Sequence, residues 1–164
     1  MRNSMLRGCL IVLVLVIFGA PQAMAEDTAK QLQANKTVVI QFIEALTSKN
    51  YDLIDQFVAL DYIDNGEPSN PAEIKKKFAE FQGAIPDMYI TVKDQIAEGD
   101  KVVTRGVWGG TQRGVLMGMK AQGKVVEVNF IMIHRLENGK LVEEWDQHDL
   151  VGLMEQLGVI PGGG

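Results

Sequence analysis

The residues best suited to chemistry gather near the C-terminus, around a predicted hairpin. Asn138-Gly139 is a strong signal for a two-residue turn between strands over 125–136 and 140–148. Such a turn determines which residues of the two strands lie opposite one another. The predicted pairs on the largely apolar face of the hairpin are His134 with Glu143, Met132 with Trp145, Phe130 with Gln147 and Val128 with Asp149.

Asp149 is the candidate for acid–base chemistry on this face. Ionisable groups are costly to bury unless they are paired, which leaves two interpretations. In the first, the face lines a pocket, and Asp149 serves there as a general acid or base against an apolar wall. In the second, Asp149 is the N-cap of a following helix, His134 and Glu143 form a pair, and Gln147 bonds to the backbone.

Other side chains are expected to complete the pocket. Gln147, Asn65 and His134 are candidates for polarising a substrate oxygen, and Asn65, in a loop after Tyr62, is placed to reach the pocket mouth. His148 is predicted to point to the opposite face, as a surface histidine. The predicted apolar wall consists of Trp108, Phe130, Met132 and Trp145, and Tyr62 is a further candidate for contact with the ligand.

Metal and nucleophile motifs are absent from the sequence. It holds two histidines and one cysteine, with no HExxH, GxSxG or phosphate-binding loop. A tight transition-metal site is therefore not expected, since such sites need several His or Cys ligands.

The N-terminal segment has the three parts of a secretory signal peptide. Arg2 and Arg7 are followed by an apolar run over 10–18 and by small residues at Ala23 and Ala25. The run is shorter than the roughly 20 residues of a membrane-spanning helix. We therefore expect residues 1–25 to be removed and the protein to be periplasmic or secreted; the alternative is an uncleaved anchor.

The expected mature part is one domain over residues 26–160 with a flexible tail over 161–164. The first 25 residues hold two of the 16 Lys and Arg, none of the 21 Asp and Glu and the one Cys. The remainder thus has a net charge of −7 and no cysteine. An acidic chain argues against nucleic acid and anionic membranes as partners.

The order of the predicted elements indicates an α+β fold. Helices are predicted over 28–48, 51–60 and 70–82, the last with Asn70 as N-cap and Pro71 after it. Residues 61–64 are predicted to be extended and 66–69 to form a loop. Strands over 88–97, 101–111, 125–136 and 140–148 follow, and a last helix spans 150–157. This order predicts helices packed on one face of a curved antiparallel sheet.

The C-terminal motif resembles the signature of the SnoaL-like polyketide cyclases, or ester cyclases. It reads Glu143-x-Trp145-x-x-x-Asp149, followed by Leu153-Met154-x-Gln156-Leu157-Gly158. The resemblance covers roughly residues 35–160. Further matching segments are Pro86-Asp87, Ala97-Glu98-Gly99-Asp100-Lys101-Val102, Gly110-Thr111-x-x-Gly114, Gly123-Lys124 and Asn138-Gly139-Lys140-Leu141.

The resemblance implies the cone-shaped α+β fold of the nuclear transport factor 2-like superfamily, with the sheet wrapped around N-terminal helices. It implies an aspartate at the position of Asp149 as the acid–base of an aldol ring closure, without metal or organic cofactor. Family members are commonly oligomeric, so a homo-oligomer is compatible with it. The chain departs from the family at Asn65 and Gln112, where many members carry histidine.

Three functions agree with these observations. The first is an enzyme that abstracts a proton next to the carbonyl of a small hydrophobic ketone or ester. The second is a cell-envelope protein that binds such a molecule without turnover or serves as an interaction module. The third is a structural oligomer built through the face that carries Ile131 and Ile133. The fold alone does not choose among them.

Overall fold

The computed structural model describes residues 20–162 and their side chains from residue 24 onward. The chain divides into two units between Gln31 and Leu32. Of the first unit, the described part is the beginning of helix α1 (Ala20–Thr47). The predicted signal peptide lies outside the described residues up to residue 19. None of the described helices has the length and hydropathy of a membrane span.

The second unit holds the remaining helices and a six-stranded sheet. The α+β prediction is confirmed, and the strands over 101–111 and 140–148 and the last helix begin and end where they were expected. The elements after α1 are η1 (Tyr51–Leu53), α2 (Ile54–Phe57), β1 (Val58–Asp64), β2 (Glu67–Ser69), α3 (Pro71–Ala84), β3 (Tyr89–Glu98), β4 (Lys101–Thr111), β5 (Val125–Glu137), β6 (Lys140–His148) and α4 (Leu150–Leu157).

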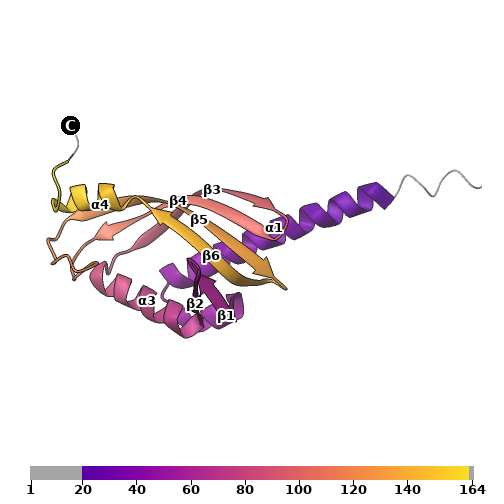
Figure 1. Cartoon of the computed structure of the whole chain (residues 1–164), viewed down its shortest axis with the longest axis horizontal. Helices are drawn as coiled ribbons and strands as arrows, with labels where there is room; N and C mark the ends of the chain where they lie inside the picture. Colours follow the sequence, from indigo (N-terminus) through magenta and orange to yellow (C-terminus); the bar gives the residue numbers. More distant parts are fainter. Residues whose placement is uncertain (1–19, 163–164) are drawn as a thin grey trace, which may run out of the picture. The chain divides into compact units, whose positions relative to one another are not determined.

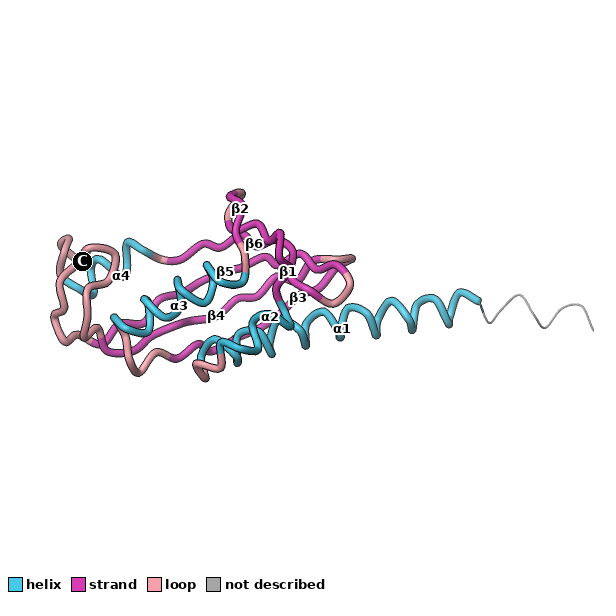
Figure 2. Tube along the Cα trace, turned by 90° about the horizontal axis from the view of Figure 1, so that it is seen from below, coloured by secondary structure: helices cyan, strands magenta, loops and turns pink. Residues whose placement is uncertain are grey.

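The strands are ordered β2-β1-β6-β5-β4-β3. All neighbours are antiparallel except β1 and β6, which run parallel. Every second residue of β5 is buried, as expected for a sheet with one covered face. Helix α3 covers that face, and from below it runs across β4 and β5 (Figures 1 and 2). Its Phe81 packs edge-on against Trp108 of β4, with ring centroids 5.4 Å apart.

Two of the sequence predictions are wrong in the region of β1 and β2. The helix predicted over 51–60 ends at Phe57, because Val58 is extended and pairs with Leu141 of β6. The loop predicted over 66–69 contains β2, which forms a hairpin with β1. The turn between them is Asn65-Gly66, with φ of 51° and 87°, and Asn-Gly is the sequence that such two-residue turns prefer.

The hairpin of β5 and β6 starts in the predicted register and then shifts by one residue. Glu137 pairs with Lys140 as predicted, but Arg135 pairs with Glu143, so Val142 is an extra residue, a β-bulge. Since side chains alternate along a strand, the shift turns every later side chain of β6 to the other face. The four pairs predicted from the turn are therefore wrong. The observed pairs are His134 with Glu144, Met132 with Asp146 and Phe130 with His148.

Candidate functional site

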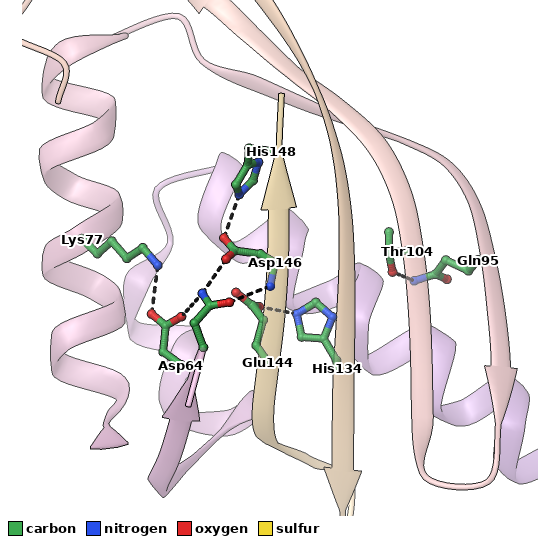
Figure 3. Close-up of polar contacts among 9 residues, drawn as sticks. Asp64, Lys77, Gln95, Thr104, His134, Glu144, Asp146 and His148 are labelled. Atoms are coloured by element: carbon green, nitrogen blue, oxygen red, sulfur yellow. Dashed lines mark hydrogen bonds and ion pairs between the residues drawn. The ribbon is translucent and has the colours of Figure 1, made fainter. Parts of the chain in front are cut away.

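Three titratable side chains of β6 point toward the covered face of the sheet. Beyond the bulge, Glu144, Asp146 and His148 alternate toward this face, whereas Trp145 and Gln147 are exposed on the other. Figure 3 shows the three in a row along the strand. Strand β6 thus presents two carboxylates and an imidazole to the interior.

Asp146, His148 and Trp108 form a hydrogen-bonded chain. His148 Nε2 lies 2.7 Å from Asp146 Oδ2, and the indole N–H of Trp108 donates to His148 Nδ1 over 3.1 Å. An indole nitrogen only donates, so His148 Nδ1 must accept, and the ring proton is on Nε2. In this arrangement the imidazole donates from Nε2 to the carboxylate of Asp146.

The turn between β1 and β2 holds Asp146 from another side. Asn65 donates from Nδ2 to Asp146 Oδ1 over 2.5 Å, and its Oδ1 accepts from the backbone N–H of Asp146 over 3.0 Å. The backbone N–H of Asn65 donates to the carbonyl of Glu144. The hydrogen bond from His148, with a further one from Asn65, lowers the pKa of Asp146 to about 2 although burial opposes this.

Lys77 reaches the same region from α3. Its Nζ lies 2.9 Å from Asp64 Oδ2, and Figure 3 shows this pair beside Asp146. Burial alone would lower the pKa of Lys77, but the bond to Asp64 and the charges of Glu144 and Asp146 raise it. The ammonium of Lys77 is thus charged and already paired.

Glu144 and His134 form a buried pair below this network. His134 Nε2 lies 2.6 Å from Glu144 Oε2, and the side chain of His134 is fully buried. Burial would raise the pKa of Glu144, but the adjacent His134 more than offsets this and lowers it. The hydroxyl of Tyr62 is buried nearby and has no hydrogen-bond partner among the described residues. Burial and the charges of Glu144 and Asp64 raise the pKa of Tyr62 far above its usual value.

A cavity of about 60 Å³ lies over these groups. A smaller one of about 20 Å³ shares Phe78, Ile90, Met132 and Glu144 with it. An apolar pocket with a few convergent polar groups is typical of small-molecule sites. Among the described residues, no group of His, Cys, Asp and Glu is placed to hold a metal ion. The larger cavity is lined by Lys77, Phe78, Phe81, Met88, Ile90, Trp108, Met132, Glu144, Asp146 and His148.

Several residues singled out in the sequence lie at this site. Trp108 and Met132 line the larger cavity, and Phe130 lines the smaller one. Asn65 contacts Asp146 directly. Tyr62 and His134 are buried around Glu144, and His134 pairs with this residue rather than with Glu143 as predicted.

Trp145 and Gln147 are not at the site. The bulge places both on the exposed face, and it places His148, predicted on the surface, against the cavity. Glu143 also faces away from the cavity, where its Oε2 accepts from Arg135 Nε over 2.8 Å.

Asp149 is exposed and caps α4. Its Oδ1 accepts from the backbone N–H of Gly152 over 2.9 Å, which is the capping interaction of the second interpretation. Asp149 is not among the described residues that line either cavity. In the described part of the chain, Asp149 thus serves as the N-cap of α4.

Gln112, one of the two departures from the family, holds a loop. It is fully buried, and its Nε2 donates to the carbonyls of Met119 and Lys120. Its Oε1 accepts from the backbone N–H of Gln122. These bonds lie in the segment between β4 and β5, so Gln112 is a structural residue of that connection.

Glu144, Asp146, His148 and Lys77 were missed as site residues. Both faces of β6 are similarly polar in sequence, so alternation alone gives no reason to choose one of them. Arg135 and Glu143 offered a signal, since an Arg–Glu pair across a hairpin is usually solvated, which would have assigned Glu143 to the outer face.

Comparison with known proteins agrees with this fold. The family model of the SnoaL-like polyketide cyclases matches residues 36–157. IdmH of Streptomyces antibioticus, a proposed polyketide cyclase, is 26% identical with a TM-score of 0.69, over 76% of this chain and 98% of its own. TsrD of Streptomyces laurentii is 26% identical with a TM-score of 0.73, over 78% and 97%.

A third solved structure shows the same fold at lower identity. AclR of Streptomyces galilaeus, a proposed hydroxylase, is 24% identical with a TM-score of 0.72, over 81% of this chain and 86% of its own. The curated proteins include no match.

Proposed function

The chain belongs to the SnoaL-like polyketide cyclase family, and from this premise we propose that it binds a small hydrophobic carbonyl compound and acts on it by acid–base catalysis. The observation that carries the proposal is the position of Asp146. This carboxylate lines an apolar cavity and is oriented by His148 and Asn65. We assign it the role that the sequence motif had suggested for Asp149.

The chemistry is the removal of a proton from a carbon next to a carbonyl. The carboxylate of Asp146 takes the proton, and the negative charge moves to the carbonyl oxygen. Lys77 also lines the cavity, and it has N–H groups beyond the one bound to Asp64, so it is the donor placed to stabilise that oxygen. The enolate can then attack a second carbonyl, as in a cyclase, or regain the proton at another carbon, as in an isomerase.

The size of the cavity limits the part of the ligand that reaches Asp146. Its volume of about 60 Å³ is less than half of the roughly 150 Å³ that a buried cavity holding benzene has. A carbonyl with its two neighbouring carbons fits this space. A fused ring system needs displacement of wall residues such as Phe78 or Phe81.

A second candidate is binding without turnover, which the low pKa of Asp146 favours. A carboxylate with a pKa of about 2 is a weak base at neutral pH. A bound apolar ligand counteracts this, because it displaces water and so raises the pKa of the carboxylate. A measurement of turnover therefore distinguishes catalysis from binding alone.

The test is exchange of the protons next to the carbonyl of small ketones and esters in deuterated water, followed by NMR. We expect Asp146→Asn to slow exchange by about 100-fold or more. Asp149→Asn is the matched comparison, since asparagine also caps helices and keeps α4 intact. Loss of exchange in Asp149→Asn alone would return the catalytic role to Asp149, and no exchange by the wild type would favour binding.

We also propose that the protein is exported, from the signal-peptide features of residues 1–25. The protein expressed with its full N-terminus should then be recovered outside the cytoplasm with Glu26 as its first residue. Intact-mass measurement of the recovered protein checks this. A mass that includes residues 1–25 would show an uncleaved segment instead.

A further inference from the structure

Negative charge outweighs positive charge around the cavity. Two carboxylates, Glu144 and Asp146, line it, and a third, Asp64, lies beside it. Lys77 is the only lysine or arginine among the described lining residues, and its ammonium is bound to Asp64. Both ring nitrogens of His148 are engaged, one with Trp108 and the other with Asp146.

The pKa values of two neighbouring groups reflect this excess of negative charge. The charges of Glu144, Asp64 and Asp146 all help to raise the pKa of the buried Tyr62. The same three charges raise the pKa of Lys77 against the effect of its burial. Both shifts have the sign expected where carboxylates dominate.

An anionic ligand would meet these carboxylates, and the single lysine of the described lining, Lys77, is already bound to Asp64. Like charges repel more strongly in a partly buried site than in water, because the effective dielectric constant is lower. An uncharged carbonyl compound avoids this repulsion and still uses the apolar walls. A neutral ligand also leaves the pair of Lys77 and Asp64 intact.

We infer that the cavity selects uncharged carbonyl compounds over organic anions. It takes a ketone or ester and rejects the corresponding carboxylic acid, and Glu144 is the residue that sets this preference. The inference rests on the proposed function for the location of the site. Glu144 is the deciding residue because it lines both cavities and lies on the same face as Asp146. Glu144 is not part of the hydrogen-bonded chain of Asp146 and His148, so the selection of ligands and the acid–base chemistry use different residues.

The test uses methyl levulinate and levulinate, which share a skeleton and differ in charge at neutral pH. Binding is followed by the NMR resonance of the indole N–H of Trp108, which belongs to the cavity wall. Trp145, the other tryptophan, lies on the exposed face and serves as the internal reference. We expect the ester to bind at least about tenfold more tightly than the acid. Equal or tighter binding of levulinate, or no shift with either compound, would overturn the inference.

Glu144→Gln tests the residue itself. It keeps the size of the side chain and removes its charge, so the preference for the ester should fall severalfold. Glu143→Gln is the matched control, because it removes the same charge one residue away, on the exposed face. Equal loss of preference in both variants would mean that net charge decides, and would refute the role of Glu144.

A second variant covers the case in which Glu144→Gln does not fold. Lys77→Gln removes the single cation of the described lining and should increase the preference for the ester, and an unchanged or smaller preference would count against the inference. These binding measurements need no turnover. Failure of proton exchange with the preference intact would therefore refute the proposed catalysis alone.

Discussion

At the scale of single residues, Trp108 determines how His148 presents its proton. Replacing Trp108 with Phe removes the donor to Nδ1, so the imidazole is free to carry its proton on either nitrogen. We expect the wild type to show the Nε2–H form and Trp108→Phe to show a mixture, read from nitrogen-15 shifts of the imidazole. With two histidines in the chain, the assignment is simple.

The matched control for this variant is Trp145→Phe, which changes the other tryptophan on the exposed face. Trp108→Phe should also lower the free energy of unfolding by about 2 kcal/mol, since it loses a buried hydrogen bond and leaves a void. An unchanged imidazole spectrum in Trp108→Phe would contradict the hydrogen-bonded chain.

Asp146 should make stability depend on acid pH. Its pKa of about 2 in the folded state lies below the ordinary 3.8, so the group favours folding above pH 4. This contribution, about 2 kcal/mol, is lost as the pH falls from about 4 through 2. Urea unfolding between these pH values should show a shallower dependence for Asp146→Asn than for the wild type. Parallel curves for the two proteins would contradict the low pKa.

At the scale of elements, the turn between β1 and β2 positions Asn65 against Asp146. Gly66 in this turn has a φ of 87° and open space around its Cα. Gly66→Ala should therefore lower the free energy of unfolding by about 1 kcal/mol, through backbone strain alone. Gly83→Ala is the contrasting variant, since Gly83 lies in α3 with open space and an ordinary φ.

Gly83→Ala should raise the free energy of unfolding by up to about 1 kcal/mol, because alanine favours the helix. Chemical denaturation measures both variants. The same sign in both would mean that local backbone preference does not govern these positions.

Local signals in the sequence were sufficient to predict most of the helices and strands. Asn138-Gly139 marked the last hairpin, and Asn70 with Pro71 marked the start of α3, where Asn70 Oδ1 accepts from two backbone N–H groups. Asn65-Gly66 carried the same turn signal and was missed. The pairing of Val58 with Leu141 could not be predicted from local sequence, since it joins strands far apart in the chain.

The candidate site was only partly predictable, because its residues depend on register. Trp108 and Met132 belong to β4 and β5, which pair without a register shift, so their positions followed from pattern. Asp146 and His148 follow the bulge at Val142, which no local propensity marks. The cap at Asp149 was one of two interpretations left open, and it required the structure to choose between them.

At the scale of the whole molecule, the exposed face of the sheet carries an apolar row across four strands. The row is Ile96, Val103, Ile133 and Trp145, each directly opposite the next. Ile96 is 68% and Trp145 38% exposed. Such a row is typical of a surface that another chain covers, so we propose a homo-oligomer through this face.

Light scattering after size-exclusion chromatography checks this expectation. The wild type should have a multiple of the monomer mass, and Ile133→Lys should be a monomer with a similar free energy of unfolding. A monomeric wild type would show the expectation to be wrong.

In evolutionary terms, the bulge at Val142 makes the chemistry of the cavity depend on how one residue is accommodated in the hairpin. A regular hairpin in which Val142 paired with Arg135 would bring Trp145 and Gln147 under the cavity and send Asp146 and His148 to the opposite face. Loss of the single codon for Val142, by contrast, would leave Asp146 and His148 opposite the same residues of β5. Two homologues with identical residues after this position can therefore differ in chemistry, and the presence of the bulge is the heritable trait to compare before a role is transferred between them.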